Sequence, residues 1–298
     1  MSRWLSTSMM SLAGLAAAFA LSSAASATPF QPWINGVSAD EPAMQVQRLD
    51  ADTYVIRQSI RTNFEGPFLY LLFGQDRALL LDSGAGGVKI RPTIDHVIAE
   101  WLADHRRRTI PLILAHSHGH GDHHQGDAEF SDRPDTTLVG LSPGDVAGFF
   151  KLADWPDQSA PYDLGGRILD IIPTPGHQAA HIMVYDARTQ VLFSGDAIYP
   201  GRLYFPLNQF NAYRDSIDRI AAFTRAHAVS YILGAHIEMT AKPGVMLVDE
   251  APSHPDEHVL ELPPATVIEL QAAIHAMGDT PRQETHRDFI IFPLPARP

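Results

Sequence analysis

Hydrophobic and polar positions follow two patterns along this chain. Short apolar runs bounded by glycine or polar residues predict buried β-strands. They cover residues 53–56, 67–73, 77–81, 111–115, 137–139, 167–172, 181–185, 191–194, 229–233 and 289–292. Apolar residues at helical spacing predict helices over residues 88–105, 211–227 and 264–277, and Ser142-Pro143 is expected to open a short helix.

The predicted strands fall into two groups, each interleaved with helices. This order favours a layered α/β sandwich over a single parallel sheet of βαβ units. Residues 28–43 are rich in proline and are expected to be an irregular lead-in. No linker divides the remainder, so we expect one domain over residues 28–298.

The N-terminus has the composition of a secretory signal peptide. Residues 1–27 contain one charged side chain, Arg3, then an apolar stretch over about residues 9–21 and the small residues Ala25-Ser26-Ala27. This pattern predicts cleavage near Ala27 and a periplasmic or secreted protein. A membrane anchor is the alternative, but the apolar stretch is shorter than the ~20 residues that cross a bilayer. We therefore expect no membrane association after cleavage.

Composition narrows the possible functions. The chain has 298 residues, of which 45% are hydrophobic and 19% are charged, as in packed globular proteins. Its formal charge is −12, and loss of Arg3 makes the mature chain −13. Such a protein has no general attraction for nucleic acid. Cysteine is absent, which excludes disulfides, thiolate metal sites and a cysteine nucleophile. Nothing in the sequence indicates the oligomeric state.

A histidine cluster directly follows the strand predicted over residues 111–115. Residues 112–126 contain five of the fifteen histidines, and four positions fit the pattern H-x-H-x-D-H: His118, His120, Asp122 and His123. Neutral imidazoles and a carboxylate are typical ligands of a divalent ion such as zinc. The glycines at 119 and 121 allow a tight loop. The alternative is a solvated histidine-rich loop that binds metal weakly.

Three more residues of the same chemical type follow other predicted strands. His177 stands in Thr174-Pro-Gly-His, Asp196 in Ser194-Gly-Asp, and His236 in Gly234-Ala-His. Loops at the carboxyl ends of strands are where α/β folds gather functional side chains. We therefore expect these residues to join the histidine cluster in one metal site.

These motifs, in this order, resemble those of the metallo-β-lactamase superfamily. The resemblance covers roughly residues 45–240 and includes Asp82-Ser83-Gly84, which matches the family's D-x-G, and Ser117, where the family often has threonine. It implies the family's four-layer αββα sandwich with two metal ions at one edge. It also implies that Asp82 orients ligands, although a cap of the strand-end turn is nearly as good an interpretation.

The resemblance assigns each ligand. His118, His120 and His177 would hold one ion, Asp196 would bridge both, and the second ion would take Asp122, His123 and His236. The implied function is an exported dinuclear-zinc hydrolase, with two Zn²⁺ per chain. A metal-bridging hydroxide would attack the carbonyl of a small ester, thioester, lactone or lactam, with Asp122 orienting this nucleophile and relaying its proton.

Alternatives stay open on the same scaffold. They are a β-lactamase of the all-His/Asp ligand type, a mononuclear iron persulfide-type oxygenase, and a zinc-binding protein without turnover. The bridging position of Asp196 argues against the first, and the sequence does not exclude iron or manganese as the native metal. The substrate is expected to be a small molecule, which the sequence does not identify.

Several residues near the motifs have two interpretations. His116, His124 and His181 are either partners of the ligands or ordinary core and surface histidines. A second group either contacts substrate or packs on the sheet: Tyr199, Arg202 and Tyr204. The polar run over residues 256–261 is expected on the solvated surface.

Overall fold

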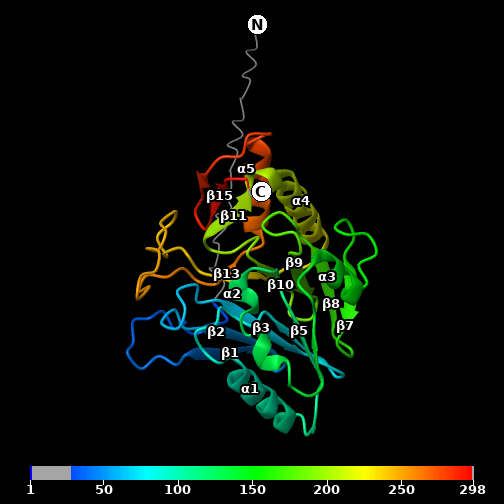
Figure 1. Ribbon diagram of the computed structural model, residues 1–298. Helices are drawn as coiled ribbons and strands as arrows, with labels where there is room; N and C mark the ends of the chain where they lie inside the picture. Colours follow the sequence, from blue (N-terminus) through cyan, green and yellow to red (C-terminus); the bar gives the residue numbers. More distant parts are fainter. Residues whose placement is uncertain (2–27, 297–298) are drawn as a thin grey trace.

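Two six-stranded sheets contain nearly all of the predicted strands (Figure 1). The structure is a computed structural model that describes Met1 and residues 28–296. The rest of the predicted signal peptide lies outside the described residues. In spatial order the first sheet consists of β1 (Met44–Asp50), β2 (Thr53–Gln58), β3 (Phe68–Phe73), β4 (Ala78–Leu81), β5 (Leu112–Ala115) and β6 (Thr136–Leu138).

The second sheet follows the same plan in the other half of the chain. Its strands are β13 (Glu261–Leu262), β12 (Tyr231–Gly234), β10 (Val191–Gly195), β9 (Ile182–Asp186), β8 (Ile168–Pro173) and β7 (Ala160–Asp163). A smaller third sheet pairs β11 (Arg202–Pro206), β15 (Ile290–Leu294) and β14 (Glu284–Thr285). The sequence pattern predicted β15 but not β7, β11, β13 or β14, which are short or lack a continuous apolar run.

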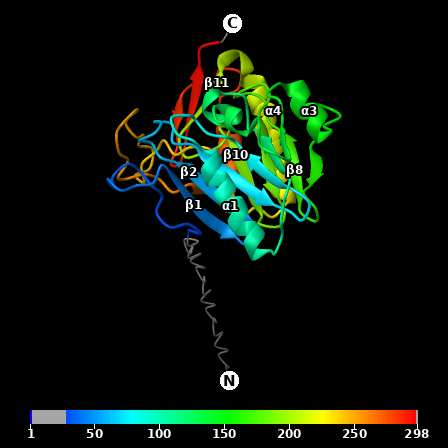
Figure 2. The same cartoon turned by 60° about the horizontal axis from the view of Figure 1, so that its bottom comes forward.

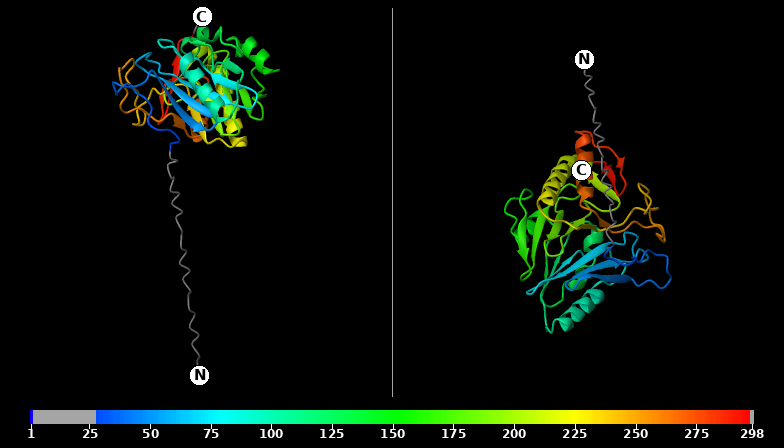
Figure 3. Two further views of the ribbon diagram at one scale, coloured as in Figure 1. Left: turned by 90° about the horizontal axis from the view of Figure 1, so that it is seen from below. Right: turned by 180° about the vertical axis from the view of Figure 1, so that it is seen from behind.

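The described helices are α1 (Arg91–Asp104), the single turn α2 (Gly121–His124), α3 (Pro143–Phe150), α4 (Phe210–Ala226) and α5 (Ala265–Ala276), with short 3-10 turns at Asp127–Phe130 and Leu207–Gln209. The three long helices, α1, α4 and α5, lie on the outer faces of the two large sheets (Figures 2 and 3). Helix α1 covers the first sheet, and α4 and α5 cover the second. None of the described helices is long and apolar enough to span a membrane.

Three hydrophobic cores hold these layers together. The central core lies between the sheets, where the rings of Tyr70 and Phe193 are 4.6 Å apart. A second core joins α1 to the first sheet, with Trp101 stacked on Phe73 at 4.4 Å. A third joins α4 and α5 to the second sheet. The layers are therefore helix, sheet, sheet and helix, which confirms the predicted αββα sandwich.

Strand direction brings the functional loops to one edge. β4, β5 and β6 are mutually parallel. β10 is parallel to β12 and antiparallel to β9, which is itself antiparallel to β8. The carboxyl ends of β8, β10 and β12 therefore lie at the same edge of the second sheet, as the sequence pattern requires for a shared site.

Candidate metal centre

Each predicted metal-binding side chain lies in the turn or loop that follows a strand. The loop after β5 carries the H-x-H-x-D-H residues, and Asp122 and His123 lie in helix α2. The end of β8 leads to His177, β10 leads to Asp196, and β12 leads to His236. The structure brings all seven predicted side chains together at one edge of the sandwich.

Two of these side chains follow glycines that a larger residue could replace only if neighbouring atoms moved. Gly176, before His177, has φ +139°, and a Cβ there would lie 2.4 Å from the Cα of Tyr213. Gly195, before Asp196, has φ +52°, and a Cβ would lie 2.8 Å from the side chains of Ser117 and His181. These turns let the backbone pass close to its neighbours and direct the next side chain into the cluster.

The seven side chains form two groups of potential ligand atoms. In the first group, Nδ1 of His120 lies 2.9 Å from Nε2 of both His118 and His177. In the second, Oδ2 of Asp122 lies 3.1 Å from Nε2 of His123 and 3.2 Å from Nε2 of His236. Nitrogen lone pairs and carboxylate oxygens this close together require protons or a cation between them.

Asp196 lies between the two groups and turns one oxygen to each. Its Oδ2 is 3.7 Å from Nε2 of His118 and 3.6 Å from Nε2 of His177. Its Oδ1 is 3.5 Å from Nε2 of His123 and 3.4 Å from Nε2 of His236. A carboxylate in this position is suited to bridging two cations.

In three of the five histidine rings, the nitrogen that faces away from the cluster is held by a fixed acceptor. Nδ1 of His123 lies 2.9 Å from Asp82 Oδ2, Nδ1 of His177 lies 2.8 Å from the Tyr204 carbonyl, and Nδ1 of His236 lies 2.9 Å from the Glu65 carbonyl. These oxygens can only accept, so each Nδ1 carries a proton and Nε2 is the nitrogen left to bind a cation. Asp82 also accepts from Ser117 N at 2.7 Å, which fits the predicted orienting role.

Two buried atoms in the cluster have no hydrogen-bond partner among the described residues: His123 Nε2 and Asp196 Oδ1. Buried polar atoms are nearly always paired, and an unpaired one indicates an ion or another ligand. Both atoms belong to the second donor group and face Asp122 and His236. The donor set, five imidazoles and two carboxylates, therefore fits divalent metal ions.

The electrostatics of the cluster also favour a cation. Burial favours the neutral ring of His236, but Asp196 and Asp122 outweigh it and raise the pKa of His236 to about 10. Burial opposes ionisation of Asp122 and Asp196 as well, yet the surrounding histidines hold the pKa of both carboxyls below the usual range. The carboxylates are thus ionised, as metal ligands must be, and a bound cation would replace the proton on His236.

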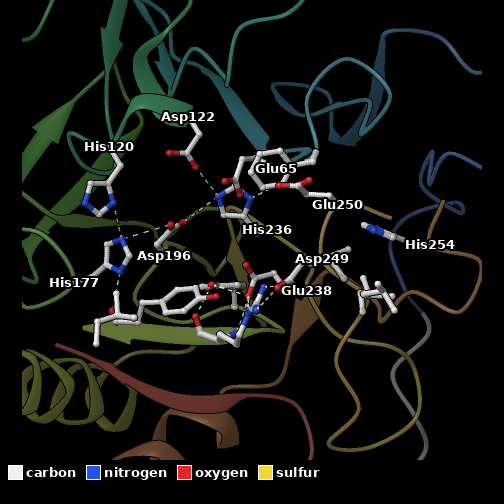
Figure 4. A pocket seen from close by; sticks show the side chains of 18 of the residues that line it. Glu65, His120, Asp122, His177, Asp196, His236, Glu238, Asp249, Glu250 and His254 are labelled. Carbon is white, nitrogen blue, oxygen red and sulfur yellow. Dashed lines mark hydrogen bonds and ion pairs between the residues drawn. The ribbon is translucent and has the colours of Figure 1, made fainter. Parts of the chain in front are cut away.

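A cavity of about 410 Å³ opens onto the centre. Figure 4 shows His120, His177, Asp122, Asp196 and His236 at its inner end. Its outer walls contain apolar, aromatic and acidic side chains, among them Phe64, Glu65, Tyr204, Glu238, Leu247, Val248, Asp249 and Glu250. This volume suits a small-molecule substrate.

The side chains for which the sequence left two interpretations, partner of the ligands or ordinary packing, lie close to the ligands but outside both donor groups. His181 is buried, and its Nε2 accepts from the Asp196 N–H at 3.2 Å. His116 pairs with Asp127 at 2.9 Å, and the ring of His124 lies edge-on to it. The group after Asp196 lines the cavity: Tyr199, Arg202 and Tyr204. Tyr199 is also buried against the sheet, with its hydroxyl on the Arg202 carbonyl.

The sequence pattern did not identify the segment between β12 and β13, which forms one wall of the cavity. Glu238, Asp249 and Glu250 stand there in a stretch without periodic hydrophobicity.

The polar run over residues 256–261 was expected on the surface, but this is wrong for Glu257. Its side chain is 7% exposed and pairs with the buried Arg57 of β2. The only sequence signal is a single charged residue, Arg57, directly after the apolar residues 54–56 of the same strand.

The chain belongs to the metallo-beta-lactamase superfamily, whose family model matches residues 63–236. It is similar to the acyl-coenzyme A thioesterase MBLAC2 of Homo sapiens, at 26% identity over 56% of this chain and 72% of the relative. It is also 25% identical to a hydroxyacylglutathione hydrolase of Rhizobium meliloti (strain 1021) over 43% of this chain and 52% of that one. The family and these relatives define the protein as a metal-dependent hydrolase.

Solved structures share its fold. The metallo-beta-lactamase FIM-1 from Pseudomonas aeruginosa, in its mono-zinc form, superposes with a TM-score of 0.51 over 81% of this chain and 98% of its own, at 16% identity. A metallo-beta-lactamase from Pontibacter korlensis gives a TM-score of 0.50 over 78% of this chain and 99% of its own, at 15% identity. At this identity the likeness concerns the fold alone.

Proposed function

We propose that the protein is a dinuclear-zinc hydrolase of small carbonyl esters, with thioesters as the leading class. His118, His120 and His177 would hold one zinc ion, and Asp122, His123 and His236 the other. The observation that carries the proposal is Asp196, whose two oxygens face the two donor groups separately. Five imidazoles and two carboxylates are suited to zinc, a borderline ion that accepts nitrogen and oxygen ligands.

The protein side chains would orient the attacking water and the metal ligands. Zinc, when bound, would supply an acidified water and polarise the substrate carbonyl. Asp122 lines the cavity, and its carboxylate is ionised. It would orient the attacking water and pass the proton to the leaving group. The rings of His123, His177 and His236 are fixed through Nδ1, so the ligand atoms are already oriented before substrate arrives.

The substrate class follows from the relatives and the cavity. One relative is named for acyl-coenzyme A thioesters and another for hydroxyacylglutathione, which is also a thioester. The cavity admits a small molecule from the surface to the metal centre. We therefore place thioesters and oxygen esters before lactones and lactams.

Metal content and a substrate panel test this proposal. Chain loaded with zinc and then desalted should retain two zinc ions and hydrolyse nitrophenyl esters or acyl thioesters. His118→Ala should retain fewer ions and lose at least about 10³-fold in kcat/KM, because a ligand is lost while the fold remains. One iron ion per chain as purified would instead indicate an oxygenase, and hydrolysis of nitrocefin alone a β-lactamase. Two bound ions with no turnover would indicate a binding protein.

We also propose that the chain is exported. The support is the composition of residues 1–27, a basic start, a short apolar stretch and a small-residue site. N-terminal sequencing of the protein from a periplasmic fraction of its expression host should give a first residue at or near Thr28. Recovery of the intact chain in the cytoplasmic fraction would contradict export.

A further inference from the structure

The cavity in front of the metal centre has a strongly one-sided charge. Beyond the seven side chains assigned to the metals it is lined by four carboxylates, Glu65, Glu238, Asp249 and Glu250, and by one guanidinium, Arg202. The outer cavity therefore has four acidic side chains and a single basic one. A substrate must pass these groups before its carbonyl reaches the centre.

The single arginine is already paired with two of these acids. Its Nε lies 3.2 Å from Glu238 Oε2, and one of its terminal nitrogens lies 2.7 Å from Asp249 Oδ1. The N–H of Arg202 also donates to Glu238 at 2.9 Å. Arg202 thus has no free charge to offer to an anionic substrate, and an incoming carboxylate or phosphate would have to displace a protein carboxylate.

The other two acids have no such partner. Within the described residues, no ion pair involves the carboxylate of Glu65 or of Glu250. Figure 4 shows Glu65 beside His236 and Glu250 further out along the cavity. These two acids, one beside the metal centre and one further out, add negative potential to the path that the substrate takes.

Apolar side chains accompany these acids. Phe64, next to Glu65, is 52% exposed, and Val248, two residues before Glu250, is 75% exposed. Both line the cavity, as does the ring of Tyr204. Carboxylates beside aromatic and apolar surface suit an alkylammonium group, whose charge is attracted by the acids and whose methyl or methylene groups contact the apolar surface.

We propose that this cavity selects esters or thioesters whose non-reacting end carries a positive charge, such as an amine or quaternary ammonium group. The inference rests on the proposed hydrolase function and specifies its substrate class. It also separates this chain from the relatives named above, because coenzyme A carries phosphates and glutathione carries carboxylates. Both would meet like charge in this cavity.

Three nitrophenyl esters of similar shape test the selection on the zinc-loaded chain. They are the ester of trimethylammonium butyrate, its neutral tert-butyl isostere, and the anionic ester of glutarate. We expect kcat/KM to favour the cationic ester over the neutral one by about tenfold or more, and the neutral over the anionic by a similar factor. Salt at about 0.5 M should reduce both ratios, since it screens charges at this range.

Matched variants locate the effect. Replacing Glu65→Gln together with Glu250→Gln should reduce the cationic-to-neutral ratio by at least about fivefold. The control pair Glu100→Gln and Asp215→Asn changes net charge equally on the outer helices α1 and α4, and should leave the ratio unchanged. A wild-type ratio near one, or a ratio that the cavity variant leaves unchanged, would overturn the inference while the hydrolase function stands. No hydrolysis of any ester would overturn both.

Discussion

Replacing Asp196 with asparagine should lower kcat/KM by at least about 10³-fold and reduce the bound zinc from two ions to one or none. The change keeps the shape of the side chain. Asparagine has one carbonyl oxygen, so it can serve only one of the two donor groups. Its NH₂ group would face the other group and repel a cation there. Atomic absorption on the desalted variant and kinetics with an ester substrate measure both effects.

A structural role for Asp196 would give a different result. In chelator the Asp196 carboxylate is the counter-charge of His236, so Asp196→Asn should unfold at a somewhat lower denaturant concentration, and a purely structural role would show this loss alone, with zinc content and rate intact in the folded variant. Asp279→Asn is the matched control, because that side chain is 96% exposed and should change neither zinc content nor rate. Full zinc occupancy together with near wild-type activity in Asp196→Asn would contradict the bridging assignment.

The convergence of the seven side chains could be predicted because its signal is local. Each residue stands two to eight positions after an apolar run, as His177 and Asp196 illustrate. Parallel strands then bring those positions to one edge, whatever the loops between them do. The fold class was predictable for the same reason, since the strands and helices alternate in the order that the layers require.

The cavity could not be predicted in this way. Its outer wall is formed by the segment between β12 and β13, which lies beside the N-terminal lead-in (Figure 3) and is tied to it where the N–H of His254 donates to the Asn35 carbonyl. Contacts between residues so far apart leave no periodic pattern in the sequence. In the sequence, the acidic residues of this wall are typical of a solvated loop. Only the structure shows that they lie around the metal centre.

The same wall is anchored by a buried ion pair. The guanidinium of Arg57 in β2 forms a two-pronged contact with the Glu257 carboxylate, and the side chains are 1% and 7% exposed. Arg57 also lies over the Phe68 ring, 4.9 Å from its centroid. His254, which lines the cavity, contacts Glu257 at 3.3 Å. The pair therefore connects the cavity wall to the first sheet across a long sequence separation.

Replacing Glu257→Gln should destabilise the protein by about 3–5 kcal/mol, because it leaves the Arg57 charge buried without a counter-ion. Urea unfolding in chelator measures this loss without a contribution from bound metal. The control is Asp104→Asn, which breaks the exposed pair with Arg48 and should cost about 0–1 kcal/mol. Adding Arg57→Met to Glu257→Gln should recover part of the stability, since the unpaired charge is then gone. A loss below about 1 kcal/mol in Glu257→Gln would mean that water reaches Arg57 and that the wall does not depend on this pair.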